Sequence, residues 1–275
     1  MSGLRAPGSG PFLVEQLHAP SEYELSGGHP IRCLPTAGRG GASAVEGAIA
    51  LRTDPAVIRA GVEVGHRLDD GTLRAPDISV GNVPDLPGWV EGPPPLAVEY
   101  ADTGQDEADL ALKASQLLAA GTRYLWVVRL TGPRRVEVHE PGKPVRVVPA
   151  DGVLTAPGVL DNAVPVAALY DAEASLEAAL VNLLQRKGYA SVEAVRAEGR
   201  TEGKTEGKIE GRVEGRVEGK IEGRAESVLA VLDARGLSVD EQQRARVLAC
   251  TDVSRLDRWL RAAVTAAGVD ELLEG

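Results

Sequence analysis

Two acidic residues of this 275-residue chain stand inside short apolar runs, where an uncompensated carboxylate is costly to bury. Asp77 lies in the run RAPDISV (residues 74–80), and Glu99 lies in LAVEYAD (residues 96–102). An acid in such a place needs a metal, a cation or a hydrogen-bond donor beside it. If the two runs are neighbouring strands, both carboxylates can bind one hard cation such as Mg²⁺, which prefers oxygen ligands. The alternative is that either acid lies at a strand end and faces water.

The runs around these acids predict the elements that position them. Strands at 23–28 and 31–35 flank a Gly-Gly turn, and strands at 62–68 and 73–80 are expected to form a hairpin. The apolar strand 96–100 precedes a helix at 105–120. That helix has an apolar face, formed by Leu110, Leu112, Leu117 and Leu118.

The rest of the first region follows the same alternation of strands and helices. The run 124–130 is apolar on both faces, which predicts a central strand. A hairpin at 135–139 and 144–148 and a helix at 172–187 complete it. Strands followed by a helix that crosses to a buried strand predict an α/β (α+β) domain, in which helices flank a mixed sheet.

The order of these motifs resembles the Uma-two family of restriction endonucleases, prokaryotic proteins with the restriction-endonuclease-like PD-(D/E)XK nuclease fold. In chain order the matching motifs are YEL (23–25), APDIS (75–79), VE (98–99), Asp109 with Lys113, AGTRYLWVV (120–128), VEV (136–138), APGVL (156–160) and PVAAL (165–169). Each motif is weak alone, but their order and spacing are specific. The resemblance ends near residue 171 and involves none of the remaining chain.

In the PD-(D/E)XK pattern the second acid and a lysine stand two residues apart, because alternation along a strand points both side chains to one face. The corresponding residue here is Ala101. The resemblance implies that the lysine has moved to the following helix, where the long side chain of Lys113 could return its ammonium to the missing position. Taken by itself, a lysine on a helix is usually solvent-exposed.

The resemblance implies a metal-dependent endonuclease that hydrolyses phosphodiester bonds in DNA, with Asp77, Glu99 and Lys113 as its catalytic residues. The two carboxylates and the backbone carbonyl of Tyr100 would bind Mg²⁺, or Mn²⁺ in its place. Lys113 would orient the attacking water or offset charge on the phosphorus. The competing hypothesis is an inactive nuclease fold that acts as an interaction protein through its C-terminal repeat and helical module.

Several positions depart from the family pattern and favour the competing hypothesis. Tyr100-Ala101-Asp102 follows Glu99, the stretch 40–46 before the first long helix lacks a histidine, and Arg129 stands where an acid is usual. Glu46 could supply an extra acid, although a solvent-exposed helical glutamate is the simpler interpretation. The intact acid pair with Lys113 opposes this hypothesis.

The net charge of −10 restricts how the chain could contact DNA. Such contact would need a local basic group, formed by Arg129, Arg134, Arg135, Lys143 and Arg146, which could equally be a solvated hairpin. No apolar run is long enough to span a membrane and the first residues are not a signal peptide, so a cytoplasmic location is expected. Cys33 and Cys250 are expected to be reduced, partly buried thiols.

A four-residue repeat, Glu-Gly-(Arg/Lys)-(Thr/Ile/Val), occupies residues 198–225. Four residues turn a helix by about 400°, so each row of equivalent residues drifts by about 40° per repeat. Interior glycines and like charges at i,i+4 make a lone helix weak. The favoured interpretation is a low-complexity tether, and the alternative is an element that packs helices together and makes the protein oligomeric.

The tail after the repeat predicts three short helices at 227–235, 238–250 and 254–267. Ser238 would be an N-cap with Glu241 completing a capping box. Leu256, Trp259 and Leu260 would form the apolar face of this module, whose partner protein is unknown. The chain is thus expected to contain a nuclease-like domain (1–187), a repeat (188–226) and a helical module (227–275). A homodimer would match the symmetry common among nucleases.

Overall fold

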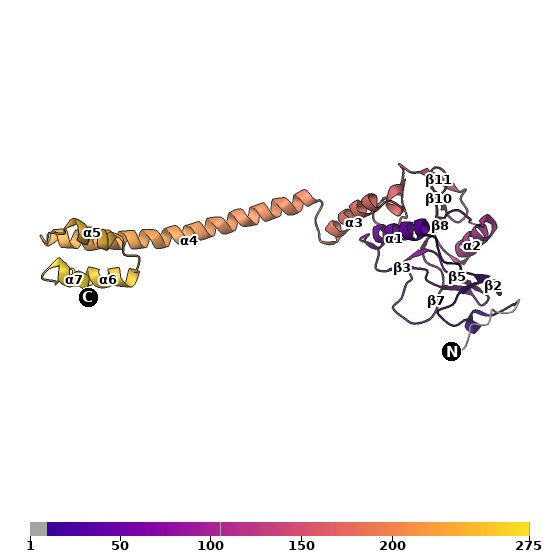
Figure 1. Cartoon of the computed structure of the whole chain (residues 1–275), viewed down its shortest axis with the longest axis horizontal. Coiled ribbons are helices and arrows are strands. Elements are labelled where there is room, and N and C mark those ends of the chain that lie inside the picture. Colours follow the sequence, from indigo (N-terminus) through magenta and orange to yellow (C-terminus); the bar gives the residue numbers. More distant parts are fainter. Residues whose placement is uncertain (1–9, 105, 275) are drawn as a thin grey trace. The chain divides into compact units, whose positions relative to one another are not determined.

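The computed structural model describes residues 10–104 and 106–274 of the chain, which divides into two compact units, Met1–Val192 and Glu193–Gly275 (Figure 1). The first unit has the predicted α/β architecture, a mixed sheet flanked by helices. Within the described ranges, no helix combines the length and the apolar character that crossing a membrane requires.

The first unit is organised by a six-stranded sheet in the order β11-β10-β9-β8-β6-β3. Its strands are β3 (Ala60–Val62), β6 (Ile78–Val80), β8 (Leu96–Ala101), β9 (Tyr124–Arg129), β10 (Arg135–His139) and β11 (Arg146–Pro149). Only β8 and β9 run parallel, and α2 (Glu107–Ala120) makes the crossover that a parallel pair requires. The predicted central position of the 124–130 run is confirmed.

Helices cover both faces of this sheet, so each strand of the centre is buried on both sides. Val98 and Tyr100 point to the face covered by α1 (Gly38–Arg52) and α3 (Ala172–Arg186). Ala97 and Ala101 point to the opposite face, where α2 packs. Glu99 alternates with Tyr100 along the strand and therefore lies on the α2 face.

The N-cap residue Asp106 fixes the start of helix α2, because its side chain binds backbone N–H groups of the first turn. The Asp106 carboxylate accepts the backbone N–H groups of Ala108 and Asp109, at 2.9 and 3.1 Å. The predicted first residue, Gln105, lies outside the described residues. The apolar face consists of Leu110, Ala114 and Leu117, with Leu118 partly buried. Leu112 is 42% exposed, so its assignment to this face was wrong.

A second sheet of five strands, β2-β1-β5-β4-β7, packs beside the first within the same unit. Its strands are β1 (Tyr23–Ser26), β2 (His29–Arg32), β4 (His66–Asp69), β5 (Thr72–Arg74) and β7 (Val90–Glu91). The predicted hairpin around the Gly-Gly turn is confirmed as β1 and β2. Cys33 follows the edge strand β2 and is exposed, which contradicts its predicted burial, whereas Cys250 is partly buried and both thiols are free.

The predicted pairing of residues 62–68 with 73–80 is confirmed, with Val62 opposite Ile78 and Arg67 opposite Leu73, but each run divides between the two sheets. β4 and β5 pair in the second sheet, while β3 and β6 pair in the first. Glu63, with φ of 50°, interrupts the first run after β3, and Pro76, which lacks an N–H donor, interrupts the second. Periodicity does not reveal such breaks, since apolar residues continue on both sides of each.

His66 joins the two sheets where the runs divide. Its ring nitrogens lie 2.9 Å from the Gly92 carbonyl oxygen and 2.9 Å from the Ser79 hydroxyl. Since a carbonyl only accepts, Nδ1 must donate to Gly92, and Nε2 accepts the hydroxyl proton of Ser79. Burial lowers the pKa of His66, which keeps the ring in this neutral form.

The hairpin β10–β11 is followed by short elements that close the first unit. Strand β11 begins at Arg146, two residues later than predicted. The elements after β11 are β12 (Val153–Leu154), β13 (Val164–Pro165) and a 3-10 helix, Val166–Leu169. Another 3-10 helix, Val14–Gln16, precedes β1. Buried side chains from the segment after β11 complete the core under α1 and α3.

Asp54 fastens this closing segment to the end of α1. Its carboxylate, 1% exposed, accepts the backbone N–H groups of Ala56, Asp161 and Asn162, at 2.9, 3.0 and 2.9 Å. Asp54→Ala leaves these donors buried without an acceptor. We expect it to lower the free energy of unfolding of the first unit by about 3 kcal/mol. Urea unfolding followed by Trp89 and Trp126 fluorescence in a Trp259→Phe background measures this.

The matched control is Asp151→Ala, since Asp151 is exposed in a turn. It should change the unfolding free energy by less than about 0.5 kcal/mol. Equal unfolding midpoints for the two variants would contradict the role assigned to Asp54.

The second unit begins with a continuous helix, α4 (Val192–Ala234), which includes the whole repeat. The repeat is therefore helical in the structure, and residues 227–235, predicted as a separate helix, mainly extend α4. Helices α5 (Glu241–Leu248), α6 (Val253–Ala262) and α7 (Val269–Glu274) follow. The N-cap of α5 is Asp240, with Gln243 completing the capping box, so the assignment to Ser238 and Glu241 was wrong. Leu256 and Trp259 are buried and Leu260 is partly buried, as predicted.

Candidate active site

The structure brings Asp77 and Glu99 together on the α2 face of the large sheet. Strands β6 and β8 are antiparallel neighbours, with Ile78 opposite Val98. Asp77 directly precedes Ile78 and Glu99 directly follows Val98, so the two acids lie opposite each other. Residues opposite in an antiparallel pair point to the same face. The two runs are therefore neighbouring strands, as a cation site shared by both acids requires.

Lys113 reaches this pair from α2. Its Nζ lies 2.8 Å from Glu99 Oε1 and donates to the Ala75 carbonyl oxygen at 2.7 Å. Ala101, where the PD-(D/E)XK pattern has lysine, faces the same side of β8. Helix α2 packs directly over that small side chain, so a lysine on the helix can place its ammonium beside Glu99. The structure thus places all three predicted residues in one cluster.

Two further charged residues belong to this cluster and were missed from the sequence. Glu24 on β1 lies 3.2 Å from Lys113 Nζ and accepts the backbone N–H of Ala75 at 3.1 Å. Arg74 donates from Nη1 to Glu24 at 2.9 Å and from Nε to Gln116 at 2.6 Å. Glu24 is 7% and Arg74 is 1% exposed.

The criterion that selected Asp77 and Glu99 could have found Glu24 as well. Glu24 stands between Tyr23 and Leu25 in a strand, so it too is an acid within an apolar run. No local pattern distinguishes Arg74, because its burial depends on the second sheet covering β5.

Burial and charge shift the protonation of the cluster. Burial raises the pKa of the Glu99 carboxyl to about 8, although Lys113 opposes the shift. Burial also raises the pKa of Asp77, against Lys113 and the Tyr100 N–H. Burial alone would lower the pKa of Lys113, but Glu99, Glu24 and Asp77 together raise it above its ordinary value. The ammonium therefore stays charged, and the two acids are poised to gain from an additional cation.

The oxygen atoms of the cluster fit a hard divalent cation. Glu99 Oε1 is buried, and among the described residues its partner is the Lys113 ammonium, 2.8 Å away. Asp77 Oδ2 accepts the Tyr100 backbone N–H at 2.6 Å, which leaves its other oxygen available. Among the described residues no three His, Cys, Asp or Glu side chains form a metal-binding group. Mg²⁺ tolerates this, since it is often held by one or two carboxylates together with water.

Tyr100 turns its side chain away from the cluster. Its hydroxyl donates to the Leu169 carbonyl oxygen at 2.8 Å and lies against Gly47 of α1, where any larger residue would collide with it. Glu46, the candidate for an extra acid, is half-buried on the same helix. Because α1 covers the opposite face of the sheet, Glu46 does not join Asp77 and Glu99. Asp102 pairs with Arg39 at the start of α1, and this hydrogen bond lowers the pKa of the Asp102 carboxyl to about 2.

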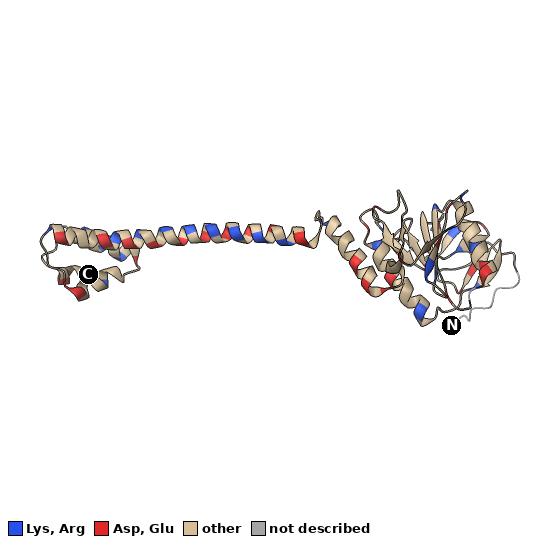
Figure 2. Ribbon diagram, turned by 90° about the horizontal axis from the view of Figure 1, so that it is seen from above, with Lys and Arg blue, Asp and Glu red and all other residues tan. Residues whose placement is uncertain are grey.

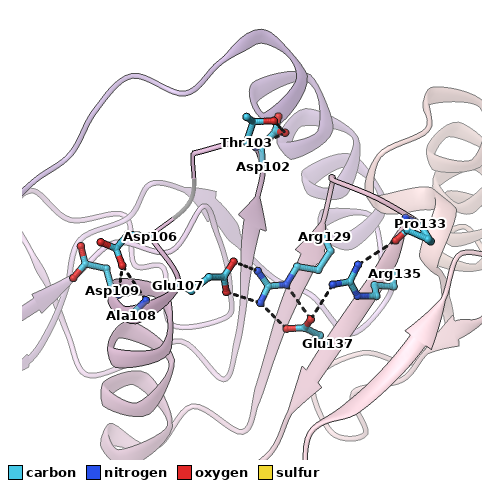
Figure 3. A network of polar contacts seen from close by, with 10 residues as sticks. All are labelled: Asp102, Thr103, Asp106, Glu107, Ala108, Asp109, Arg129, Pro133, Arg135 and Glu137. Atoms are coloured by element: carbon cyan, nitrogen blue, oxygen red, sulfur yellow. Dashed lines mark hydrogen bonds and ion pairs between the residues drawn. The ribbon is translucent and has the colours of Figure 1, made fainter.

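The basic group considered for nucleic-acid contact is largely paired with acids. Figure 3 shows the Arg129 guanidinium between Glu107 and Glu137, with Nη1 2.6 Å from Glu107 and Nη2 2.9 Å from Glu137. Arg135 also faces Glu137, at 3.6 Å. These pairs neutralise the surface at the start of α2.

Two of the other members also have partners, whereas Arg146 is exposed on β11. Lys143 lies 2.6 Å from Glu140, and Arg134 stacks 5.0 Å from the centre of the Tyr170 ring. The structural interpretation of a charged hairpin therefore fits this group better than a phosphate-binding patch.

Comparison with known families supports the assignment of the fold. Residues 13–167 match the model of the Uma2 family, described as "Putative restriction endonuclease". The chain belongs to the Uma2 family. All five members of the charged cluster lie within the matched residues, and the second unit lies outside them.

A solved structure resembles the Uma2 unit of this chain. It is described as "a putative nuclease belonging to DUF820 from Anabaena variabilis ATCC 29413". The two share 19% sequence identity with a TM-score of 0.50, over 58% of this chain and 98% of the other. At this identity the likeness establishes the fold alone. No curated protein matches the chain.

Proposed function

We propose that this Uma2 protein is a metal-dependent endonuclease that hydrolyses phosphodiester bonds in DNA. The observation that carries the proposal is the approach of Lys113 to Glu99, 2.8 Å apart, on the sheet face that also holds Asp77. Two carboxylates that can hold a metal ion, with a charged lysine beside them, can support metal-assisted phosphodiester hydrolysis. DNA is the proposed substrate because the family is described as restriction endonucleases.

Asp77 and Glu99 would hold Mg²⁺ or Mn²⁺, with the Tyr100 backbone carbonyl as a further oxygen ligand. The bound cation would supply Lewis acidity and a more acidic water. Lys113 would stabilise the negative charge that develops on the phosphate, since its ammonium is fixed and remains charged. Glu24 holds the ammonium from its other side, which sets the position of Lys113.

The experiment is cleavage of supercoiled plasmid and single-stranded DNA by the full chain with Mg²⁺ or Mn²⁺. Asp77→Asn and Glu99→Gln should each reduce the rate by about 10³-fold or more, because each removes a charged oxygen ligand. Asp85→Asn is the matched control, since Asp85 is exposed and pairs only with Arg59 among the described residues.

Two results would overturn the proposal. One is the absence of cutting under either metal, which would favour the interaction-protein hypothesis. The other is cutting by Asp77→Asn or Glu99→Gln at the rate of the Asp85→Asn control, because the active site would then lie elsewhere.

A further inference from the structure

The repeat section of α4 has no support from the rest of the described chain. Ile209, Val213 and Val217, which we call the apolar row, are 59%, 58% and 51% exposed. A Cβ built at any of the repeat glycines, 199 to 223 in steps of four, meets nothing within 4 Å. The buried residues of α4 all lie at its C-terminal end, from Ala225 onward. Each interior glycine costs about 1 kcal/mol relative to alanine, so this section is weak as an isolated helix.

Ion pairs within the helix cannot compensate for this weakness. Glutamate and basic residues of the repeat are two or six positions apart, never three or four, and so they do not face each other. Among the described residues, the ion pair that α4 makes is Arg224 with Asp257, at 2.9 Å, near its C-terminal end. The charges of the repeat are therefore available to another molecule.

The charges of the repeat are separated by side around the apolar row. On one side lies the basic row, Lys208, Arg212 and Arg216, and on the other lies the acidic row, Glu210, Glu214 and Glu218. Each is one residue, about 100°, from the apolar row. Figure 2 shows the two signs alternating along α4. All three rows drift together, so they remain in register with one another over these repeats.

This arrangement matches a second copy of the same helix in one orientation. When two parallel helices meet through the same row, the left flank of each faces the right flank of the other, as in parallel coiled coils. The acidic row of one copy then lies beside the basic row of the other along both edges of the contact. In an antiparallel pair like charges would face each other, which is unfavourable.

We propose that α4 associates in parallel with α4 of a second copy of this chain, through the apolar row flanked by the acidic and basic rows. Residues repeating every four positions form the ridges that interdigitate when helices cross at about −50°. Contact through the apolar row buries the exposed Ile209, Val213 and Val217, and the charged edges set the orientation. The helix thereby obtains from a partner the stabilisation that its own chain lacks.

The test compares full-length charge variants by sedimentation velocity and native mass spectrometry at low salt. The acidic variant carries Lys208→Glu, Arg212→Glu and Arg216→Glu, and the basic variant carries Glu210→Lys, Glu214→Lys and Glu218→Lys. The wild-type chain should be dimeric, and each variant alone should dissociate with a Kd raised on the order of 100-fold, because both edges become repulsive. An equimolar mixture of the two should form a heterodimer. Raising salt to about 1 M should weaken it.

A variant of unchanged composition controls for the number and type of charges in the repeat. It exchanges the two charged rows: Lys208→Glu, Arg212→Glu and Arg216→Glu together with Glu210→Lys, Glu214→Arg and Glu218→Arg. It should dimerise with itself as the wild type does, because its parallel pair again places an acidic row beside a basic row along both edges. A monomeric wild-type chain, failure of the acidic and basic variants to pair, or failure of the exchanged variant to dimerise with itself would overturn the proposal. None of these measurements depends on nuclease activity.

Discussion

Lys113→Met is expected to reduce DNA cleavage by about 10²–10³-fold and at the same time to strengthen Mn²⁺ binding. The ammonium of Lys113 lies 2.8 Å from Glu99, so its positive charge opposes the binding of a cation to the same carboxylate. Methionine has a similar length and no charge. With methionine at position 113, the negative charge of Asp77 and Glu99 is uncompensated and attracts a divalent ion more strongly.

Opposite changes in binding and catalysis separate the catalytic role of Lys113 from a structural one. Mn²⁺ affinity is measured by calorimetric titration without DNA, and the cleavage rate is measured at saturating Mn²⁺. Simple damage to the site would weaken both quantities together.

Lys143→Met is the matched control for this variant. Lys143 is exposed and pairs with Glu140, away from the cluster, so the control should cleave DNA and bind Mn²⁺ as the wild type does. If Lys113→Met cut DNA at the rate of Lys143→Met, the ammonium would have no part in the reaction.

Glu24→Gln is expected to lower the free energy of unfolding of the first unit by about 3–5 kcal/mol. The Glu24 carboxylate contacts both Arg74, at 2.9 Å, and Lys113, at 3.2 Å. Glutamine keeps the shape of the side chain but carries no charge. Its NH2 group would also face Arg74 or Lys113, which are themselves hydrogen-bond donors. Among the described residues, Arg74 already has one buried nitrogen, Nη2, without a hydrogen-bond partner, and it would keep only its Nε contact with Gln116.

Urea unfolding in a Trp259→Phe background, with fluorescence from Trp89 and Trp126, measures this loss in the first unit. Glu22→Gln on the same segment is the matched control. Glu22 has an exposed side chain 3.9 Å from Arg32, and surface pairs of this kind contribute less than about 1 kcal/mol. If both variants unfolded at the same urea concentration with the same slope, the Glu24 cluster would contribute nothing to stability.

Much of the site was recoverable from residue types alone. Asp77 and Glu99 stand out because acids interrupt apolar runs, and their meeting follows once the runs are neighbouring strands. Lys113 was proposed from a resemblance, since helical periodicity gives a lysine no special status. Its contact with Glu99 depends on α2 packing over Ala101.

The errors share a physical cause in contacts between residues distant in sequence. The run 73–80 changes sheets at Pro76 because its two halves have different neighbours on their other edge, β1 beside β5 and β8 beside β6, and alternation reports faces but not partners. The helical repeat is a separate case, because its local propensity is poor and its glycines and apolar row meet no other part of the described chain. Leu112 satisfies the helical period yet lies at the edge of the face that meets the sheet.

The sequence by itself determined which residues are costly to bury, where strands and helices fall, and that a charge-patterned repeat separates two other regions. Only the tertiary structure decided that Glu24 and Arg74 share the site with Asp77, Glu99 and Lys113. Their approach requires the second sheet, with β1 and β5, to meet the first beside α2. Local propensity acts over a few residues, whereas the charge environment of a buried site is set by whichever distant strands exclude water from it.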